Sequence, residues 1–232
     1  MGKNELWDSL RSKSKYIETD MDLLRRKRTG SYYTDLELTD VMMAELISYV
    51  KKGNKNIIEY RFFEPCVGAG NFVFSYLKEV KKNWNLSAEK AKILLENVYV
   101  ADVNEKALQG YKESLKIIAQ EYWGIKLEDE YFKSHLGTGL LVDVTACELT
   151  YIPLEKVFPD VEMNSFDIVV TNPPYKNLKA ERGHYGSDEE YEIDRKKYSS
   201  IVKIVSKRFK YSKDGVLNLY KLFVEEIIDR YA

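Results

Sequence analysis

Four residues, Asn172-Pro173-Pro174-Tyr175, follow an apolar run at residues 166–170 that is typical of a buried strand. Proline has no N–H and a nearly fixed φ, so the Asn172 side-chain oxygen and the Pro173 carbonyl can both accept hydrogen bonds from one planar NH2 group. Two such acceptors would draw the amine toward tetrahedral geometry and favour its attack on an electrophilic methyl group. Tyr175 offers a ring that can stack on the ring system carrying the amine. These residues therefore predict methyl transfer to a planar amine.

A second group of polar and glycine residues, in the string EPCVGAG, follows the apolar run at residues 57–63. Gly68 and Gly70 permit a tight turn and close backbone approach, and Glu64 can accept hydrogen bonds from a cationic amine or from loop N–H groups. Asp102 ends the next apolar run, where a carboxylate can bind both hydroxyls of a ribose. An ordinary turn or helix cap would explain each residue taken alone. Together they predict a site for a nucleoside with a cationic tail.

These residues would be positioned by strands that alternate with helices. Strands are predicted at residues 57–63, 97–104 and 166–172, and helices at residues 40–50, 71–82, from Ser87 onward and at 105–123. Residues 133–159 give no clear pattern. Alternating strands and helices imply right-handed crossovers, which predict an α/β fold with a doubly wound, mostly parallel sheet. Ligands bind beyond the carboxyl ends of such strands, so the two groups of residues should meet there.

Composition limits the class of protein. A chain of 232 residues, 44% hydrophobic and 31% charged, is long enough for one sizeable domain, and its net charge of -1 gives no bulk attraction to nucleic acid. The polar N-terminus does not resemble a signal peptide, and no apolar run approaches the roughly 20 residues that span a bilayer. Cys66 and Cys147 have no disulfide or metal-ligand spacing. We therefore expect a cytoplasmic protein with no bound metal and no membrane contact.

With these motifs the chain resembles the N6-adenine DNA methyltransferases that use S-adenosylmethionine. In the matching arrangement of that family a cofactor-loop motif, here TGSYYT at residues 29–34, precedes the glycine-rich motif. The resemblance implies a Rossmann-like methyltransferase domain over residues 29–232, with residues 1–28 forming a charged N-terminal arm or helix. It also implies that the target adenine of double-stranded DNA is flipped out of the helix, in a restriction-modification or related system.

The resemblance assigns roles to individual residues. It implies that the catalytic residues, which contact the target amine and base, are Asn172, Pro173, Pro174 and Tyr175. Tyr33 and Thr34 would contact the methionine end of the cofactor, Glu64 its amino group and Asp102 its ribose. The glycine-rich loop and the turn after Asp102 would supply the further cofactor contacts Cys66, Gly68, Gly70 and Val103.

Two assignments near the adenine of the cofactor have alternatives. Either Thr138 in HLGTGLL or Asp143 in LLVDVT would face the cofactor's adenine N6. Phe223 in NLYKLF would lie beside the adenine ring. An equally good interpretation places Phe223 in a core-facing helical stripe made of Tyr220, Phe223, Val224, Ile227 and Ile228.

Basic residues interleaved with tyrosines follow the Asn-Pro-Pro-Tyr motif, up to Lys213. This composition suits contacts to phosphates and stacking on bases. A solvated face is the alternative interpretation, because the acidic residues Asp188, Glu189, Glu190, Glu192 and Asp194 lie within the segment.

The resemblance covers the front half of a catalytic domain, since the chain ends at Ala232, after the helix that should precede further strands. We therefore expect a shortened gene product, an excised fragment or one part of a split protein, with a recognition region or specificity subunit elsewhere. Two alternative functions remain at this stage. One is methylation of protein glutamine or of an RNA amine, which shares the chemistry, and the other is a non-catalytic module that binds DNA or a partner.

Overall fold

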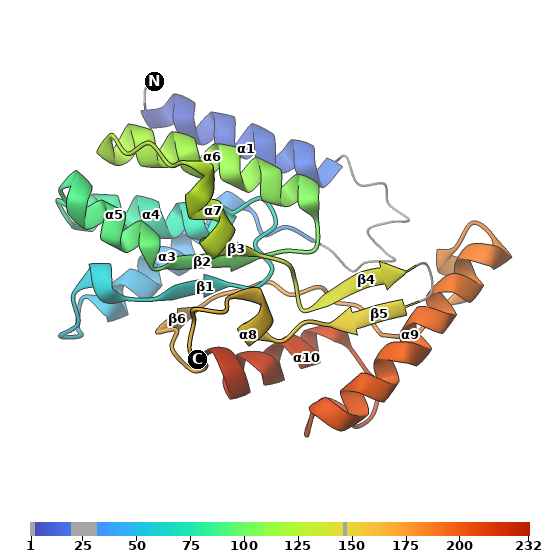
Figure 1. The fold of residues 1–232 in the computed structure, drawn as a ribbon. Helices are drawn as coiled ribbons and strands as arrows, with labels where there is room; N and C mark the ends of the chain where they lie inside the picture. Colours follow the sequence, from blue (N-terminus) through green and yellow to red (C-terminus); the bar gives the residue numbers. More distant parts are fainter. Residues whose placement is uncertain (1–2, 20–31, 146–147) are drawn as a thin grey trace.

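A four-stranded parallel sheet forms the centre of the molecule (Figure 1). The structure is a computed structural model that describes residues 3–19, 32–145 and 148–232. The strand order is β3-β2-β1-β6, and the strands are β1 (Phe62–Glu64), β2 (Val98–Ala101), β3 (Leu136–Gly137) and β6 (Ile168–Val169). Each neighbouring pair is parallel. The predicted α/β fold with a mostly parallel sheet is therefore confirmed.

Helices cover both faces of this sheet (Figure 1). On one face lie α1 (Lys3–Thr19), α4 (Asn71–Asn83), α5 (Ala88–Glu96) and α6 (Glu105–Trp123). Helix α3 (Leu36–Val50) packs on α4, and α7 (Asp129–His135) leads into β3. The opposite face carries α8 (Leu154–Val157) and α10 (Leu219–Glu226), and α10 continues as a π-helix at Ile227–Tyr231. The layers thus leave the strand ends as the place where loops from both faces converge.

A second, two-stranded unit stands to one side of the central sheet (Figure 1). Strand β4 (Leu141–Thr145) pairs antiparallel with β5 (Glu148–Tyr151), and α9 (Asp188–Arg208) packs against β5. Two short 3-10 helices, Ile57–Glu59 and Arg182–His184, complete the described elements. Because β4 follows β3 after a short turn, this unit lies beyond the carboxyl ends of the parallel strands.

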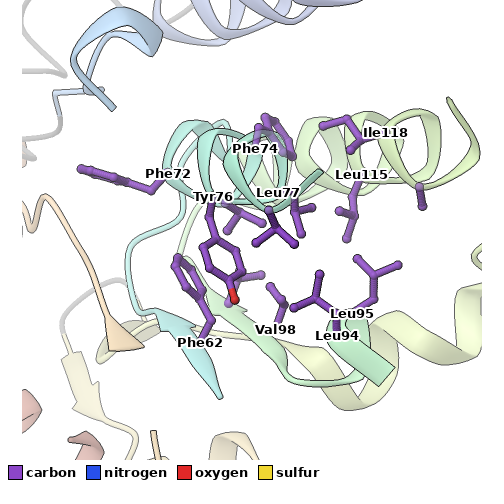
Figure 2. Close-up of a cluster of buried hydrophobic side chains, with 14 of the residues drawn as sticks. Phe62, Phe72, Phe74, Tyr76, Leu77, Leu94, Leu95, Val98, Leu115 and Ile118 are labelled. Carbon is purple, nitrogen blue, oxygen red and sulfur yellow. The ribbon is translucent and has the colours of Figure 1, made fainter. Parts of the chain in front are cut away.

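The main core lies between the sheet and helices α4, α5 and α6 (Figure 2). Phe62 of β1 stacks on Tyr76 of α4 with ring centroids 4.7 Å apart, and Leu94 and Leu115 fill the space toward the other helices. Burying each such side chain contributes roughly 1.5–3 kcal/mol. This packing fixes α4 relative to β1, and so fixes the glycine-rich loop that joins them.

Several local predictions differ from the structure. The strand predicted at residues 57–63 begins instead with a 3-10 turn at Ile57–Glu59, because the Asn56 side chain accepts the Ile58 N–H and caps a turn. Strands β3, β4 and β5 lie in residues 133–159, where no element was predicted. On the last helix the predicted core stripe is wrong for Tyr220, Val224 and Ile228, which are 37%, 45% and 69% exposed.

The N-terminal segment contributes to the core in its described part. Leu6 and Leu10 of α1 are buried against the main cluster, and α1 contacts α6. Within the described residues, no helix is long and apolar enough to cross a membrane. Residues 29–31 of the predicted cofactor-loop motif and Cys147 lie outside the described residues.

Candidate active site

The glycine-rich loop turns sharply between β1 and α4. Gly68 and Gly70 have φ angles of 51° and 94°, in the region that favours glycine. A Cβ added at Gly68 would lie 2.4 Å from Cε1 of Tyr33, and one at Gly70 would lie 2.5 Å from Cζ of Phe74. Both positions therefore require glycine for backbone conformation and for space.

Glu64 lies at the end of β1 and is buried, with 2% of its surface exposed. The Val73 N–H, in the first turn of α4, hydrogen-bonds the carboxylate, but Oε2 has no partner among the described residues. Burial, and then the negative charge of Asp102, raise the pKa of Glu64 well above its ordinary value, and the Val73 N–H opposes them. A buried carboxylate oxygen without a partner costs about 1–3 kcal/mol or more. Glu64 is thus an acceptor ready for a cationic donor.

Asp102 follows β2 and binds the loop beside it. Its Oδ2 accepts the Gly68 N–H at 2.8 Å, and its Oδ1 accepts the Asn104 N–H at 2.8 Å. Burial raises the pKa of Asp102, while these backbone hydrogen bonds lower it. Asn104 begins α6 as its N-cap and places Nδ2 3.5 Å from the Tyr33 hydroxyl. Asp102 therefore holds the glycine-rich loop against the start of α6, and Val103 beside it is 60% exposed.

A small pocket joins the glycine-rich loop to the Asn-Pro-Pro-Tyr loop. Its volume is about 20 Å³, which is room for about one water molecule. The lining residues are Tyr32, Tyr33, Thr34, Glu64, Cys66, Val67, Ala69, Asn71, Phe72 and Asn172. Burial and the charge of Asp102 raise the pKa of the Cys66 thiol, so Cys66 stays protonated and is a poor nucleophile.

Asn172 is bound by the segment that precedes α3. Its Nδ2 donates to the Tyr32 carbonyl at 3.2 Å and to Oγ1 of Thr34 at 3.0 Å. The Thr34 carbonyl in turn accepts the Nδ2 of Asn71, the first residue of α4, at 2.6 Å. One short segment, Tyr32–Thr34, therefore contacts the glycine-rich loop, the start of α4 and Asn172.

The remainder of the Asn-Pro-Pro-Tyr loop is anchored to the start of α10. The Pro174 carbonyl accepts the Lys176 N–H at 3.1 Å, and the Lys176 carbonyl accepts the Leu219 N–H at 2.7 Å. Tyr175 between them is 60% exposed, and its ring centroid lies 5.9 Å from that of Tyr220. The loop thus presents an accessible ring next to Asn172.

The structure separates the residues that were expected near the cofactor's adenine. Thr138 directly follows β3, whose Gly137 pairs with Ala101 of β2, so Thr138 and Asp102 end neighbouring parallel strands. Asp143 lies inside β4, where it pairs with Leu149 of the hairpin. Phe223 is 4% exposed and belongs to a core cluster with Leu140, Leu178, Ile201, Val205, Phe209 and Leu222.

Two asparagines at this site were missed in the sequence. Asn71 holds the Thr34 carbonyl, and Asn104 contacts the Tyr33 hydroxyl. Asn104 had a recognisable signal, since it precedes a helical pattern and so resembles an N-cap. Asn71 had no sequence signal except its position directly after Gly70.

The comparisons with known proteins agree with this architecture. Residues 96–231, more than half of the chain, match the model of the Eco57I restriction-modification methylase family. The match includes Asp102 and Asn172, whereas Glu64 and the glycine-rich loop precede it. A search of curated proteins found no match.

A solved structure is similar in fold. A chain of a cryo-EM structure of a DrdV–DNA complex superposes with a TM-score of 0.62 at 12% sequence identity. The alignment covers 97% of the present chain and 22% of the DrdV chain, so the present chain spans about a fifth of that protein's length. At this identity the likeness shows the fold alone. The family match covers more than half of the chain, and it shows that the chain belongs to the Eco57I restriction-modification methylase family.

Proposed function

We propose that this methylase transfers a methyl group from S-adenosylmethionine to N6 of adenine in DNA, within a restriction-modification system. The observation that supports it most is that Glu64 and Asn172 line the same pocket. An acceptor for a cationic ligand and an amide that can receive an NH2 group thus lie together at the strand ends, where ligands of such sheets bind. Family membership supplies the methyl-transfer chemistry.

The residues at and beside this pocket fit S-adenosylmethionine chemically. The unpaired Oε2 of Glu64 suits the amino group of the methionine part, and Asp102 suits the ribose. We place Thr138 at the cofactor's adenine, in preference to Asp143, because Thr138 ends the strand beside Asp102. The cofactor would extend from this pocket along the strand ends, since the pocket itself has only about 20 Å³. S-adenosylmethionine, when bound, supplies the electrophilic methyl group.

The protein's own groups would then prepare the target amine. Asn172 Oδ1 and the Pro173 carbonyl accept hydrogen bonds from N6, which holds the amine in place and favours tetrahedral geometry at nitrogen. Tyr175, exposed beside them, stacks on the extruded adenine. Extrusion is required because an enzyme cannot reach an amino group inside the base stack.

Helix α9 offers a surface for the DNA backbone. Lys196, Lys203 and Lys207 are exposed on the face of α9 opposite the buried Ile201 and Val205. None of the three lysines has an ion-pair partner within the described part of the chain. Unpaired lysines along one helix face can contact a row of phosphates. Such contacts supply most of the affinity for DNA that does not depend on sequence. The DNA in the DrdV complex is consistent with this use of the fold.

Transfer of labelled methyl groups tests the proposal. The chain is incubated with methyl-labelled S-adenosylmethionine and, in separate reactions, with unmethylated plasmid DNA, with RNA and with protein extract. We expect label in DNA, and nuclease digestion followed by mass spectrometry should find it in N6-methyladenine. Label in RNA or in glutamine, label on cytosine, or the absence of cofactor binding by the chain would each overturn the proposal.

A further inference from the structure

We propose that Thr34 and the Tyr32 carbonyl are positioning groups that set the orientation of the Asn172 amide. The inference rests on the proposed function, because it explains how the acceptor oxygen is turned toward the target amine. It gives Thr34 a role distinct from the cofactor contact expected from the sequence. The evidence for this inference is two hydrogen bonds of the Asn172 side chain.

The orientation of the Asn172 amide follows from the partners of its nitrogen. A carbonyl oxygen only accepts hydrogen bonds, so the group facing the Tyr32 carbonyl at 3.2 Å is the NH2 and not the oxygen. The second N–H donates to Oγ1 of Thr34 at 3.0 Å. Both hydrogens of the amide are thereby used. Oδ1 of Asn172 has no hydrogen-bond partner among the described residues and is directed away from the segment that holds the nitrogen.

The holding segment is itself fixed at several points. The Thr34 carbonyl accepts the Asn71 Nδ2 at 2.6 Å, and the Tyr33 ring covers Gly68. Asp35, the next residue, caps α3 by accepting the Glu37 N–H at 2.7 Å. These contacts keep the backbone of Tyr32 and Thr34 in place. The groups that orient Asn172 are thus held by the same elements that form the cofactor loop.

Removing the Thr34 hydroxyl would leave the amide with one fixed hydrogen instead of two. The terminal torsion of asparagine is broad, so the amide could rotate and turn its oxygen away from the amine. Methyl transfer should therefore slow, whereas a residue that only binds the methionine end of the cofactor would change cofactor affinity. Loss of the positioning role should therefore lower kcat, whereas loss of a cofactor contact should raise the KM for S-adenosylmethionine.

Steady-state kinetics of Thr34→Val and Thr34→Ser separate these roles. Valine keeps the shape of threonine and removes the hydroxyl, so we expect kcat to fall roughly 3- to 10-fold with little change in the KM for S-adenosylmethionine. Serine restores the hydroxyl and should lie closer to wild type than to Thr34→Val. Ser48→Ala, which removes a hydroxyl that donates to the Glu45 carbonyl within α3, is the matched control. A raised cofactor KM with unchanged kcat would overturn the positioning role.

A measurement without turnover keeps this inference separate from the proposed function. The side-chain NH2 signals of Asn172 in the NMR spectrum of the labelled chain should shift in Thr34→Val and return toward wild type in Thr34→Ser. Unchanged Asn172 signals in Thr34→Val would refute the positioning contact even if the enzyme methylates adenine. Shifted signals in a chain that never methylates adenine would support the contact and refute the proposed function. If Thr34→Val does not fold, Thr34→Ala measured against Thr34→Ser serves the same comparison.

Discussion

Substitution of Glu64 by glutamine tests the cofactor site at its most unusual group. Glu64 is 2% exposed, and one of its carboxylate oxygens has no hydrogen-bond partner among the described residues. Glu64→Gln keeps the volume of the side chain and removes the negative charge. If a cationic amine binds to this carboxylate, the loss should fall on cofactor affinity and not on folding.

The expected size follows from one charge-assisted hydrogen bond. Such bonds contribute roughly 1.5–3 kcal/mol, and 1.4 kcal/mol corresponds to a factor of about ten in affinity. The Kd for S-adenosylmethionine should therefore rise roughly 10- to 150-fold in Glu64→Gln. The melting temperature without cofactor should be no lower than that of wild type, because glutamine is neutral at every pH and never places a second negative charge beside Asp102.

The pKa of Glu64 adds a dependence on pH with a definite sign. Burial raises the pKa of Glu64 in the cofactor-free protein well above its ordinary value of 4.5. The contribution of Glu64 to the stability of the folded protein is therefore fully present below pH 4.5 and is lost as pH rises through the raised pKa. A cationic ligand favours the ionised form. Cofactor affinity should therefore increase as pH rises through the raised pKa of Glu64, and binding at a pH below that pKa should release a proton.

Calorimetric titration measures both effects. Below the raised pKa of Glu64, binding heats in buffers of different ionisation enthalpy report the proton released, which should be present in wild type and absent in Glu64→Gln. Glu59→Gln, which changes an exposed carboxylate in the 3-10 turn that precedes β1, is the control and should bind as wild type does. Equal affinities of wild type and Glu64→Gln at a pH where wild-type Glu64 is ionised would refute the assignment of Glu64 to the cofactor amine.

Three further predictions concern the base, the DNA backbone and the loop. Tyr175→Ala should weaken capture of an extruded fluorescent base analogue by roughly 1–3 kcal/mol while Tyr175→Phe keeps most of it, and equal loss in both would refute stacking. Replacing the three α9 lysines with glutamine should make the negative slope of log K for DNA association against log salt concentration shallower, by about 0.9 for each phosphate that the lysines no longer neutralise. An unchanged slope would mean that the DNA binds elsewhere. Gly68→Ala should lower stability by more than the roughly 1–2 kcal/mol expected from left-handed φ alone, since the new Cβ would meet the Tyr33 ring. Gly215→Ala, with φ of 74° and no heavy atom within 4 Å of the added Cβ, is the thermal-unfolding control, and equal destabilisation of the two variants would contradict the clash with Tyr33.

The strand ends could be predicted from the sequence because apolar runs are interrupted there by polar and glycine residues. Glu64, Asp102 and Asn172 each follow such a run, and parallel strands bring their carboxyl ends to one edge. The structure places Glu64 and Asn172 on one pocket, as that reasoning requires. Local patterning was sufficient for this part of the site.

Other parts of the site depend on contacts that local patterning does not encode. The hydrogen bond between Asn172 and Thr34 joins residues 138 positions apart, and neither residue type specifies the other. Strand β3 has only two residues, too few for an alternating pattern, so the place of Thr138 beside Asp102 was not visible. The exposure of Val224 and Ile228 depends on which face of the last helix meets the sheet, and an apolar residue alone does not decide this.

The identity of the methylated nucleoside tests the central claim most directly. Unmethylated plasmid DNA is treated with S-adenosylmethionine and either the wild-type chain or Asn172→Ala, then digested to nucleosides and analysed by mass spectrometry. We predict N6-methyladenine with wild type, and a rate of formation lower by about 10² or more with Asn172→Ala at unchanged cofactor affinity. Methylcytosine in place of N6-methyladenine, or equal rates for the two proteins, would contradict the claim.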